Sequence, residues 1–254
     1  MKLKVKIFGE RNTGTNYLAK LIENNFEVEI LRGAISKGSI FTFREWTKDL
    51  FFKFTRNRNL GWKHSIIDLN LVLNHKEKPI IITLTKNPYS FLLSLYNRPY
   101  HYKGNKSSPF LSFLKEKWKL TDRDNCKEKS LNTPIELWNI KNKSYIDLLS
   151  NYTDCLLFTY EELLENPNKV IVKISDKLDI SLKEKFINYD DSTKNDNKDF
   201  NDYQNYYLNE LWKRELNNDE IIFINSKLDL NVLSYFGYEI YKKNNENIIQ
   251  KNKI

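Results

Sequence analysis

Residues 3–18 read LKVKIFGERNTGTNYL, and this stretch carries the main indication of the fold. Leu3 to Phe8 predicts a short strand, and Thr15 to Asn25 predicts a helix whose apolar residues share one face. Gly9 and Gly14 bracket the turn between them, although the chain has only 7 glycines. The spacing Gly-x-x-x-x-Gly lets a backbone wrap closely, so that N–H groups point inward at a helix N-terminus. The turn therefore predicts a cradle for an anionic group; a tight turn without a ligand is the alternative, against which Arg11 counts.

The turn departs from the pattern of nucleotide hydrolases. Thr15-Asn16 follows Gly14 where those proteins have Lys followed by Ser or Thr. The apolar run Ile80 to Leu84 leads into Thr85-Lys86, which places a cation where a magnesium site needs a carboxylate. We therefore expect an anionic ligand that is bound without ATP and without a metal ion.

The rest of the chain alternates strands with helices. Ile80 to Leu84 predicts a buried central strand, followed by a helix at Tyr89 to Tyr96, and Cys155 to Thr159 predicts another strand. This alternation is typical of an α/β fold with a central parallel sheet flanked by helices. Residues 1–240 are interpreted as one domain and 241–254 as a flexible polar tail. Shorter strands are expected at 26–31 and 60–64, and further helices at 66–74, 109–120, 134–150, 168–178, 206–216 and 219–228.

A second candidate anion site follows the central strand. Lys86 stands at the end of that strand, Pro88 begins a helix, and Ser94 lies eight residues after Lys86. In a parallel sheet the carboxyl ends of neighbouring strands meet at one edge, so Lys86 and Ser94 are expected beside the glycine turn. The pattern predicts one ligand with two separated anionic groups.

Composition and charge limit the possible functions. The chain has 254 residues, with 41 Lys and Arg against 33 Asp and Glu, for a net charge of +8. A basic surface favours an anionic partner, although a general enrichment in Lys, Asn and Ile explains the charge equally well. No apolar run is long enough to span a membrane, and the first residues do not form a secretory signal. Cys126 and Cys155 do not form a disulfide framework, so a cytoplasmic location is expected.

Taken together, the motifs resemble those of sulfotransferases that use 3′-phosphoadenosine 5′-phosphosulfate (PAPS). The first is RNTGTNYL at 11–18, and the second is IITLTKNP at 81–88 with Ser94 at the family's spacing. The third is LLFTYEEL at 156–163, and residues 211–238 resemble the C-terminal helix pair. The resemblance covers roughly residues 3–240. It implies a P-loop nucleoside-triphosphate-hydrolase-like sulfotransferase fold, with PAPS as co-substrate and no metal.

The resemblance also implies roles for individual residues. The 5′-phosphosulfate would be held at Arg11, Asn12, Thr13, Gly14, Thr15 and Asn16, the 3′-phosphate by Lys86 and Ser94, and the adenine beside Tyr160. The family's loop lysine falls at Asn12, so its work would pass to Arg11. The family's second-motif arginine is Lys86, which keeps the charge without the forked geometry. The basic segment that closes over the 3′-phosphate has no clear match; Lys194, Lys198 and Lys213 are candidates.

His64 is the candidate catalytic base. It lies in Gly61-Trp62-Lys63-His64-Ser65, which resembles the family segment in which a lysine shortly precedes the catalytic histidine. A neutral histidine can take the proton of an acceptor hydroxyl while Arg11 stabilises developing negative charge. A structural His64 beside Trp62 is the alternative. His75 is expected in a surface turn, His101 in the acceptor site, and Glu45 is a weaker candidate base.

The acceptor and the alternative functions complete the predictions. Aromatic residues are expected to flank an acceptor cleft or to form core, and a hydroxyl of a carbohydrate or polysaccharide is the first choice of acceptor. One alternative is a small-molecule or nucleotide kinase with a degenerate phosphate loop. The other is a basic nucleic-acid-binding protein, for which no recognised motif is present, so no nucleic-acid partner is expected. The aromatic residues in question are Trp46, Phe51, Phe52, Tyr96, Tyr100 and Tyr102.

Overall fold

A computed structural model describes residues 2–35, 39–42, 44–100, 108–193 and 196–243. Its centre is a sheet of parallel strands in the order β2 (Glu29–Ile30), β1 (Lys4–Gly9), β3 (Ile80–Thr85) and β6 (Cys155–Thr159). Every residue of β3 is buried, as its continuous apolar run requires for a central strand. The predicted α/β architecture with a central parallel sheet is confirmed.

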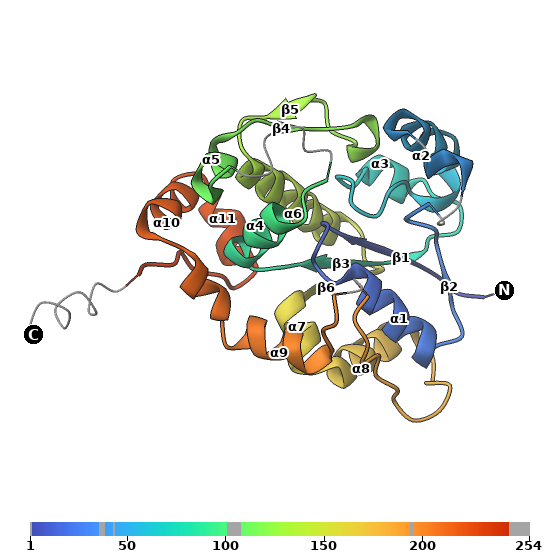
Figure 1. Cartoon of the computed structure of the whole chain (residues 1–254). Coiled ribbons are helices and arrows are strands. Elements are labelled where there is room, and N and C mark those ends of the chain that lie inside the picture. The colour runs from blue at the N-terminus through green and yellow to red at the C-terminus, as the bar shows by residue number, and fades with distance from the viewer. Residues whose placement is uncertain (1, 36–38, 43, 101–107, 194–195, 244–254) are drawn as a thin grey trace, which may run out of the picture.

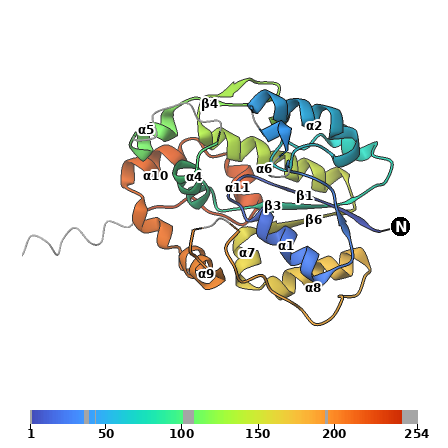
Figure 2. The same cartoon turned by 45° about the vertical axis from the view of Figure 1, so that its right-hand side comes forward.

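Helices cover both faces of the sheet, so the molecule has three layers (Figures 1 and 2). One face carries α1 (Thr15–Asn25), α7 (Tyr160–Glu165) and α8 (Pro167–Leu178). The opposite face carries α4 (Pro88–Asn97), α6 (Pro134–Asn151) and α11 (Leu230–Tyr235). Apolar residues at helical spacing, such as Leu18, Leu21 and Ile22 of α1, lie on the side facing the sheet and are fully buried.

The remaining elements surround this sandwich. A two-stranded antiparallel ribbon, β4 (Trp118–Lys119) with β5 (Ser130–Leu131), lies beside α5 (Phe110–Lys115). The other elements are η1 (Ile40–Thr42), α2 (Glu45–Asn59), α3 (Leu69–Leu73), η2 (Asp122–Asp124), α9 (Phe200–Leu208), η3 (Leu211–Glu215) and α10 (Asn218–Asn225). Across the described residues, none of the helices combines the length and apolar character that crossing a bilayer requires.

The strand register brings the two predicted anion sites to the same edge of the sheet. Gly9 at the end of β1 is paired with Leu84 of β3, and Thr85 is paired with Thr159 of β6. The glycine turn after β1 and Lys86 after β3 therefore follow neighbouring positions. This is the convergence that the parallel arrangement predicts.

The expected strand at 60–64 is wrong. Leu60 and Gly61 adopt left-handed conformations, with φ of 59° and 82°, and this turn ends α2. The segment then runs past the end of β1, where Gly9 N–H donates to Lys63 O at 2.9 Å. The buried Lys6 donates to Gly61 O at 2.5 Å, and burial holds its pKa well below the ordinary value. The single hydrogen bond between Gly9 N–H and Lys63 O fixes the position of the neighbouring His64, but it does not extend into the ladder of hydrogen bonds that a strand requires.

Other differences come from tertiary packing. The expected helix at 109–120 is shorter, because α5 ends at Lys115 and the chain turns into β4. The strand expected at 26–31 is shorter than predicted, because β2 consists of Glu29–Ile30 only. His75, expected in a surface turn, is buried in the turn after α3. Tyr241, the first residue of the expected tail, packs edge-on against Trp212.

Candidate active site

The glycine turn forms an open helix N-terminus. Gly14 is the N-cap residue of α1, has a φ of 87°, and no side chain caps the helix. The first N–H groups of α1 therefore have no partner within the helix and can receive an anion. A Cβ on Gly14 would lie 2.5 Å from the ring of Tyr160. Glycine is thus required here both by the backbone angle and by the neighbouring ring.

The buried carboxylate of Glu10 holds the glycine turn by hydrogen bonds. Glu10 Oε1 accepts hydrogen bonds from the backbone N–H of Arg11 and from the Tyr100 hydroxyl, each at 2.6 Å. The Thr13 hydroxyl donates to Glu10 O at 2.6 Å, and Thr13 is buried. The Thr13 N–H also donates to Glu10 O, at 3.3 Å, so both donors of Thr13 are used inside the loop and Thr13 does not line the pocket in front of the turn.

A pocket of about 630 Å³ opens in front of this turn; we call it the loop pocket. It brings together six of the predicted site residues: Arg11, Asn12, Gly14, Thr15, Asn16 and His64. Its other lining residues are Ala34, Ile35, Lys48, Phe52, Trp62, Lys63, Arg98, Pro99, Arg123 and Thr193. None of these described lining residues is an aspartate or glutamate, whereas five are lysine or arginine. Three of these five, Lys48, Arg98 and Arg123, form ion pairs with carboxylates outside the lining, so Arg11 and Lys63 supply most of the positive charge that the pocket presents.

Two of these cations stand closest to the glycine turn. The Arg11 guanidinium lies over the Tyr100 ring at 4.5 Å, and Lys63 Nζ donates to Asn16 Oδ1. Among the described residues neither Arg11 nor Lys63 forms an ion pair with a carboxylate. Burial and the charge of Arg11 lower the pKa of Lys63 to about 8. Lys63 is thus the second cation beside the turn, a role that is not predicted from the sequence.

His64 is buried at the edge of the loop pocket and is oriented by one hydrogen bond. Its Nδ1 lies 2.5 Å from Gly9 O, which accepts only, so Nδ1 carries the proton and Nε2 keeps its lone pair. Burial, together with the charges of Lys63 and Arg11, holds the pKa of His64 well below its ordinary value. His64 is therefore neutral at physiological pH, and the same surroundings disfavour its protonated form. The ring also packs edge-on against Trp62 at 5.1 Å, which is the contact that the structural alternative predicts.

A buried ion cluster lies behind His64 and the turn. Lys141 of α6 is fully buried, with Nζ 2.7 Å from Glu10 Oε2 and 3.0 Å from Asp124 Oδ1. It also donates to His64 O. Burial opposes the charged form, but the two carboxylates raise the pKa of Lys141 above its ordinary value. The signal for this cluster was a lysine on the buried stripe of α6, between Trp138 and Tyr145.

Lys86 and Ser94 meet behind the turn, as predicted, but they are covered. Lys86 Nζ donates to Ser94 Oγ at 2.8 Å and to Asn12 O at 3.3 Å. Lys86 has no exposed surface, since the ring of Tyr207 lies 4.0 Å from Nζ. Burial lowers the pKa of Lys86 to about 7, against the opposing charge of Glu161. The Lys86 side chain is therefore covered by the Tyr207 ring of α9.

A second pocket of about 370 Å³ is lined in part by Tyr207; we call it the tyrosine pocket. It is lined by Asn12, Ser94, Asn97, Arg98, Asp196, Lys198, Asp202, Tyr203, Tyr206, Tyr207 and Glu215. Asn12 and Arg98 line both pockets, and Asn12 Nδ2 donates to Ser94 O at 3.2 Å. The two pockets therefore meet at Asn12 and Arg98, but the tyrosine pocket, unlike the loop pocket, is also lined by three carboxylates, Asp196, Asp202 and Glu215.

Several predicted residues have other neighbours. The Tyr160 ring packs against Gly14 and lies 5.0 Å from the Tyr207 ring. Of the candidate basic residues for the 3′-phosphate, Lys198 lines the tyrosine pocket, whereas Lys213 forms an ion pair with Glu210 at 2.5 Å. Lys194, His101 and Tyr102 lie outside the described residues.

The remaining candidates contribute less to the loop pocket. Glu45, the weaker candidate base, forms ion pairs with Lys48 and Arg123 and does not line this pocket. Tyr96 donates to Ser108 O and packs against α5, and Tyr100 is buried, so both belong to the core. Phe52 is the only one of the six predicted acceptor-site aromatics among the described lining residues of the loop pocket.

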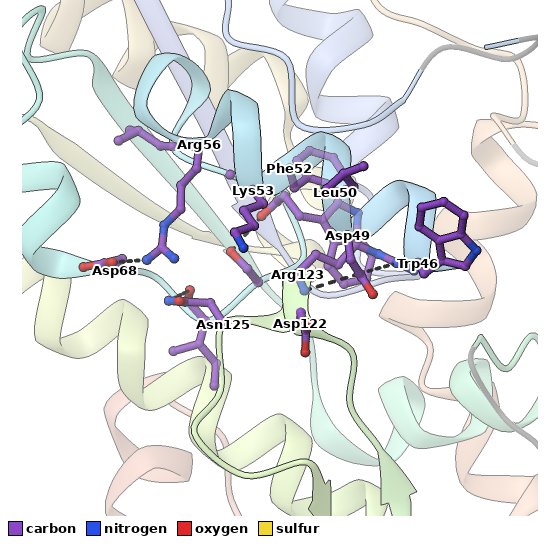
Figure 3. Close-up of a pocket in the computed structure, with 15 residues that line it drawn as sticks. Trp46, Asp49, Leu50, Phe52, Lys53, Arg56, Asp68, Asp122, Arg123 and Asn125 are labelled. Carbon is purple, nitrogen blue, oxygen red and sulfur yellow. Dashed lines mark hydrogen bonds and ion pairs between the residues drawn. The ribbon is translucent and has the colours of Figure 1, made fainter. Parts of the chain in front are cut away.

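A third pocket, of about 540 Å³, lies under α2 beside the loop pocket (Figure 3); we call it the α2 pocket. It shares Phe52, Trp62 and Arg123 with the loop pocket. Its charged side chains are largely paired: Arg56 with Asp68, and Arg123 with Asp49 at 2.7 Å. Figure 3 shows Trp46, Leu50 and Lys53 projecting from α2 around this pocket.

Comparison with solved structures identifies the fold. The sulfotransferase domain from the curacin biosynthetic pathway matches 95% of this chain and 99% of its own length, with a TM-score of 0.51 and 10% identity. A sulfotransferase from Alicyclobacillus acidocaldarius matches 94% of this chain and 97% of its own, with a TM-score of 0.50 and 11% identity. The chain therefore has the fold of the sulfotransferases, and the predicted fold family is confirmed.

The other comparisons add less. Mouse sulfotransferase SULT7A1, solved in complex with PAP, gives a TM-score of 0.45 at 18% identity, and the match covers 72% of this chain and 61% of that one. No protein-family model matches the sequence, and a search of the curated proteins finds no match. The fold is shown, and the activity has to be argued from the site.

Proposed function

We propose that this protein transfers a sulfuryl group from PAPS to a hydroxyl group of an acceptor. The observation that carries the proposal is the loop pocket: an uncapped helix N-terminus, several cations and a neutral histidine, with no carboxylate among the described lining residues. A kinase that binds ATP with magnesium needs carboxylates near the phosphates. The composition of this pocket therefore favours a sulfuryl donor over ATP with magnesium.

The residues suit the phosphosulfate end of PAPS better than its 3′-phosphate end, because Asp196, Asp202 and Glu215 line the tyrosine pocket. The N–H groups at the start of α1, with Arg11 and Lys63, would hold the phosphosulfate. Lys86, Ser94 and Lys198 would hold the 3′-phosphate across Asn12, in or beside the tyrosine pocket. Because Tyr207 covers Lys86 in this structure, binding of the 3′-phosphate to that cation requires the Tyr207 side chain to move.

The proposed chemistry uses this chain's own groups in defined roles. His64 Nε2 accepts the proton of the acceptor hydroxyl as the hydroxyl oxygen forms its bond to sulfur. The bond between sulfur and the bridging oxygen breaks, and the phosphate leaves with both electrons of that bond. Arg11 and Lys63 stabilise the charge that develops on the bridging oxygen. Lys141 and Gly9 O hold His64 in position from the opposite side.

The acceptor is proposed as a hydroxyl compound, and a carbohydrate remains the predicted class. Phe52 and Trp62 line the loop pocket, but both are buried, so the carbohydrate class rests on the sequence prediction. The donor and the acceptor hydroxyl must approach each other in this pocket, because it contains both the glycine turn and His64.

Nucleotide binding tests the proposal most directly. Calorimetric titration with PAP, the 3′,5′-bisphosphate product, should show binding that weakens at least tenfold when the 3′-phosphate is removed. Lys86→Gln should reduce this difference between the two nucleotides, because it removes the cation opposite the 3′-phosphate. Equal affinity for both nucleotides in the native protein would contradict the proposed donor.

A second test separates the base from the binding groups. His64→Gln should lower turnover by about 10²- to 10⁴-fold while PAP still binds, because the base acts only in the transition state. His75→Gln is the matched control: His75 is also buried but does not line the loop pocket. Near-normal turnover of His64→Gln would remove His64 from the base role.

A further inference from the structure

The outer face of α2 is apolar where it meets solvent. Trp46, Leu50 and Phe54 lie at successive i, i+4 positions and are 59%, 36% and 76% exposed, and Ile40 in the preceding η1 is 73% exposed. We call these four residues the α2 stripe. A surface helix normally turns its apolar residues inward. Contiguous exposed apolar side chains of this size mark an interaction surface.

Cations flank the α2 stripe on both sides. Lys53 and Arg58 of α2 are exposed on either side of the stripe on the helix surface, and Arg44 is exposed just before the helix. Of the two acidic residues of α2, Asp49 is half-buried and pairs with Arg123, whereas Glu45 is exposed beside Trp46 and pairs with Lys48 and Arg123. The face therefore combines an aromatic and aliphatic stripe with positive borders.

This combination distinguishes between possible occupants. In a symmetric dimer the face would meet its own copy, and Lys53, Arg58 and Arg44 would stand opposite like charges. A phospholipid surface offers both complements at once: an interfacial layer suited to Trp and Phe, and anionic headgroups for the flanking cations. The net charge of +8 adds a longer-range attraction to such a surface.

We propose that the α2 stripe docks this protein on an anionic phospholipid surface, with α2 lying in the plane of the interface. The helix also carries Phe52 and Lys48, which line the loop pocket, while Trp46 and Leu50 line the mouth of the α2 pocket (Figure 3). Docking through this face brings both pockets next to the lipid. An acceptor held in or near a membrane would then reach the loop pocket directly. The docking itself does not depend on the proposed sulfuryl transfer.

Cosedimentation of the full chain with vesicles tests the proposal. Vesicles of phosphatidylglycerol and phosphatidylcholine should bind the native protein, and pure phosphatidylcholine vesicles should bind it more weakly. Replacing both Trp46→Ser and Phe54→Ser should lower the partition coefficient at least tenfold, since two interfacial side chains are lost. Replacing Lys53→Gln and Arg58→Gln should lower binding to the anionic vesicles by about fivefold for each cation removed.

The matched control is Ile222→Ser. Ile222 is 65% exposed on α10, at the end of the molecule away from α2 in both views (Figures 1 and 2), so its replacement should leave vesicle binding unchanged. Absence of native binding at low salt would overturn the proposal, as would equal binding of the Trp46→Ser, Phe54→Ser variant. A concentration-dependent dimer that this variant abolishes, without vesicle binding, would overturn it in favour of a second copy of the chain.

Discussion

Replacing Gly14 with alanine should disrupt the glycine turn by two separate effects. The residue has a φ of 87°, and the left-handed region costs an L-residue roughly 1–2 kcal/mol. The new Cβ would also lie 2.5 Å from two ring carbons of Tyr160, a buried side chain that cannot simply swing away. Overpacking of this kind costs about 1–3 kcal/mol. Urea unfolding should therefore show a loss of about 2–5 kcal/mol, the sum of the two ranges.

Gly237→Ala isolates the backbone effect. Gly237 has a φ of 73°, and a Cβ there would meet no atom within 4 Å, so only the roughly 1–2 kcal/mol conformational cost is expected. Adding Tyr160→Leu to Gly14→Ala should recover part of the steric cost. If Gly14→Ala lowers the free energy of unfolding no more than Gly237→Ala does, then the Tyr160 ring does not exclude a Cβ at position 14, and the explanation of this glycine is wrong.

Three further predictions concern the residues around the turn. Lys141→Met should cost about 3–5 kcal/mol in urea unfolding, because the carboxylates of Glu10 and Asp124 lose the cation buried between them. Burial lowers the pKa of His64, so below about pH 6.5 the unfolded chain takes up a proton that the folded chain does not. The free energy of unfolding should therefore fall with decreasing pH by up to about 1.4 kcal/mol per unit. In pH-dependent thermal unfolding His64→Gln should reduce this slope, and an unchanged slope would contradict the assignment. Lys63→Ala should lower kcat by about a hundredfold in a sulfuryl-transfer assay, as removal of one charge-stabilising donor does, and an unaffected kcat would exclude Lys63 from the reaction.

The local signals in the sequence were sufficient for the glycine turn and for the first, central and last strands of the sheet, but not for the segment at 60–64. The apolar run at 80–84 could only be a buried strand, and β3 is buried throughout. Gly9 and Gly14 marked a strand-to-helix turn; the structure places Gly14 at the start of α1 with a φ of 87°, and a Cβ on Gly9 would lie 2.8 Å from Leu84 O. The parallel arrangement then required Lys86 and Ser94 to follow β3 near that turn, and Lys86 donates to Ser94 there.

The sequence did not reveal the groups that complete the site, because these are brought together by contacts between distant segments. Lys141 lies seventy-seven residues after His64 yet donates to its carbonyl oxygen, and no periodicity indicates which buried lysine finds a carboxylate. The cover of Tyr207 over Lys86 depends on how α9 packs, and the exposure of Trp46 on α2 depends on which face of that helix turns inward. Residue type and spacing determine which local structures form; burial, charge pairing and access to ligand are properties of the surroundings, which exist only once the chain has folded.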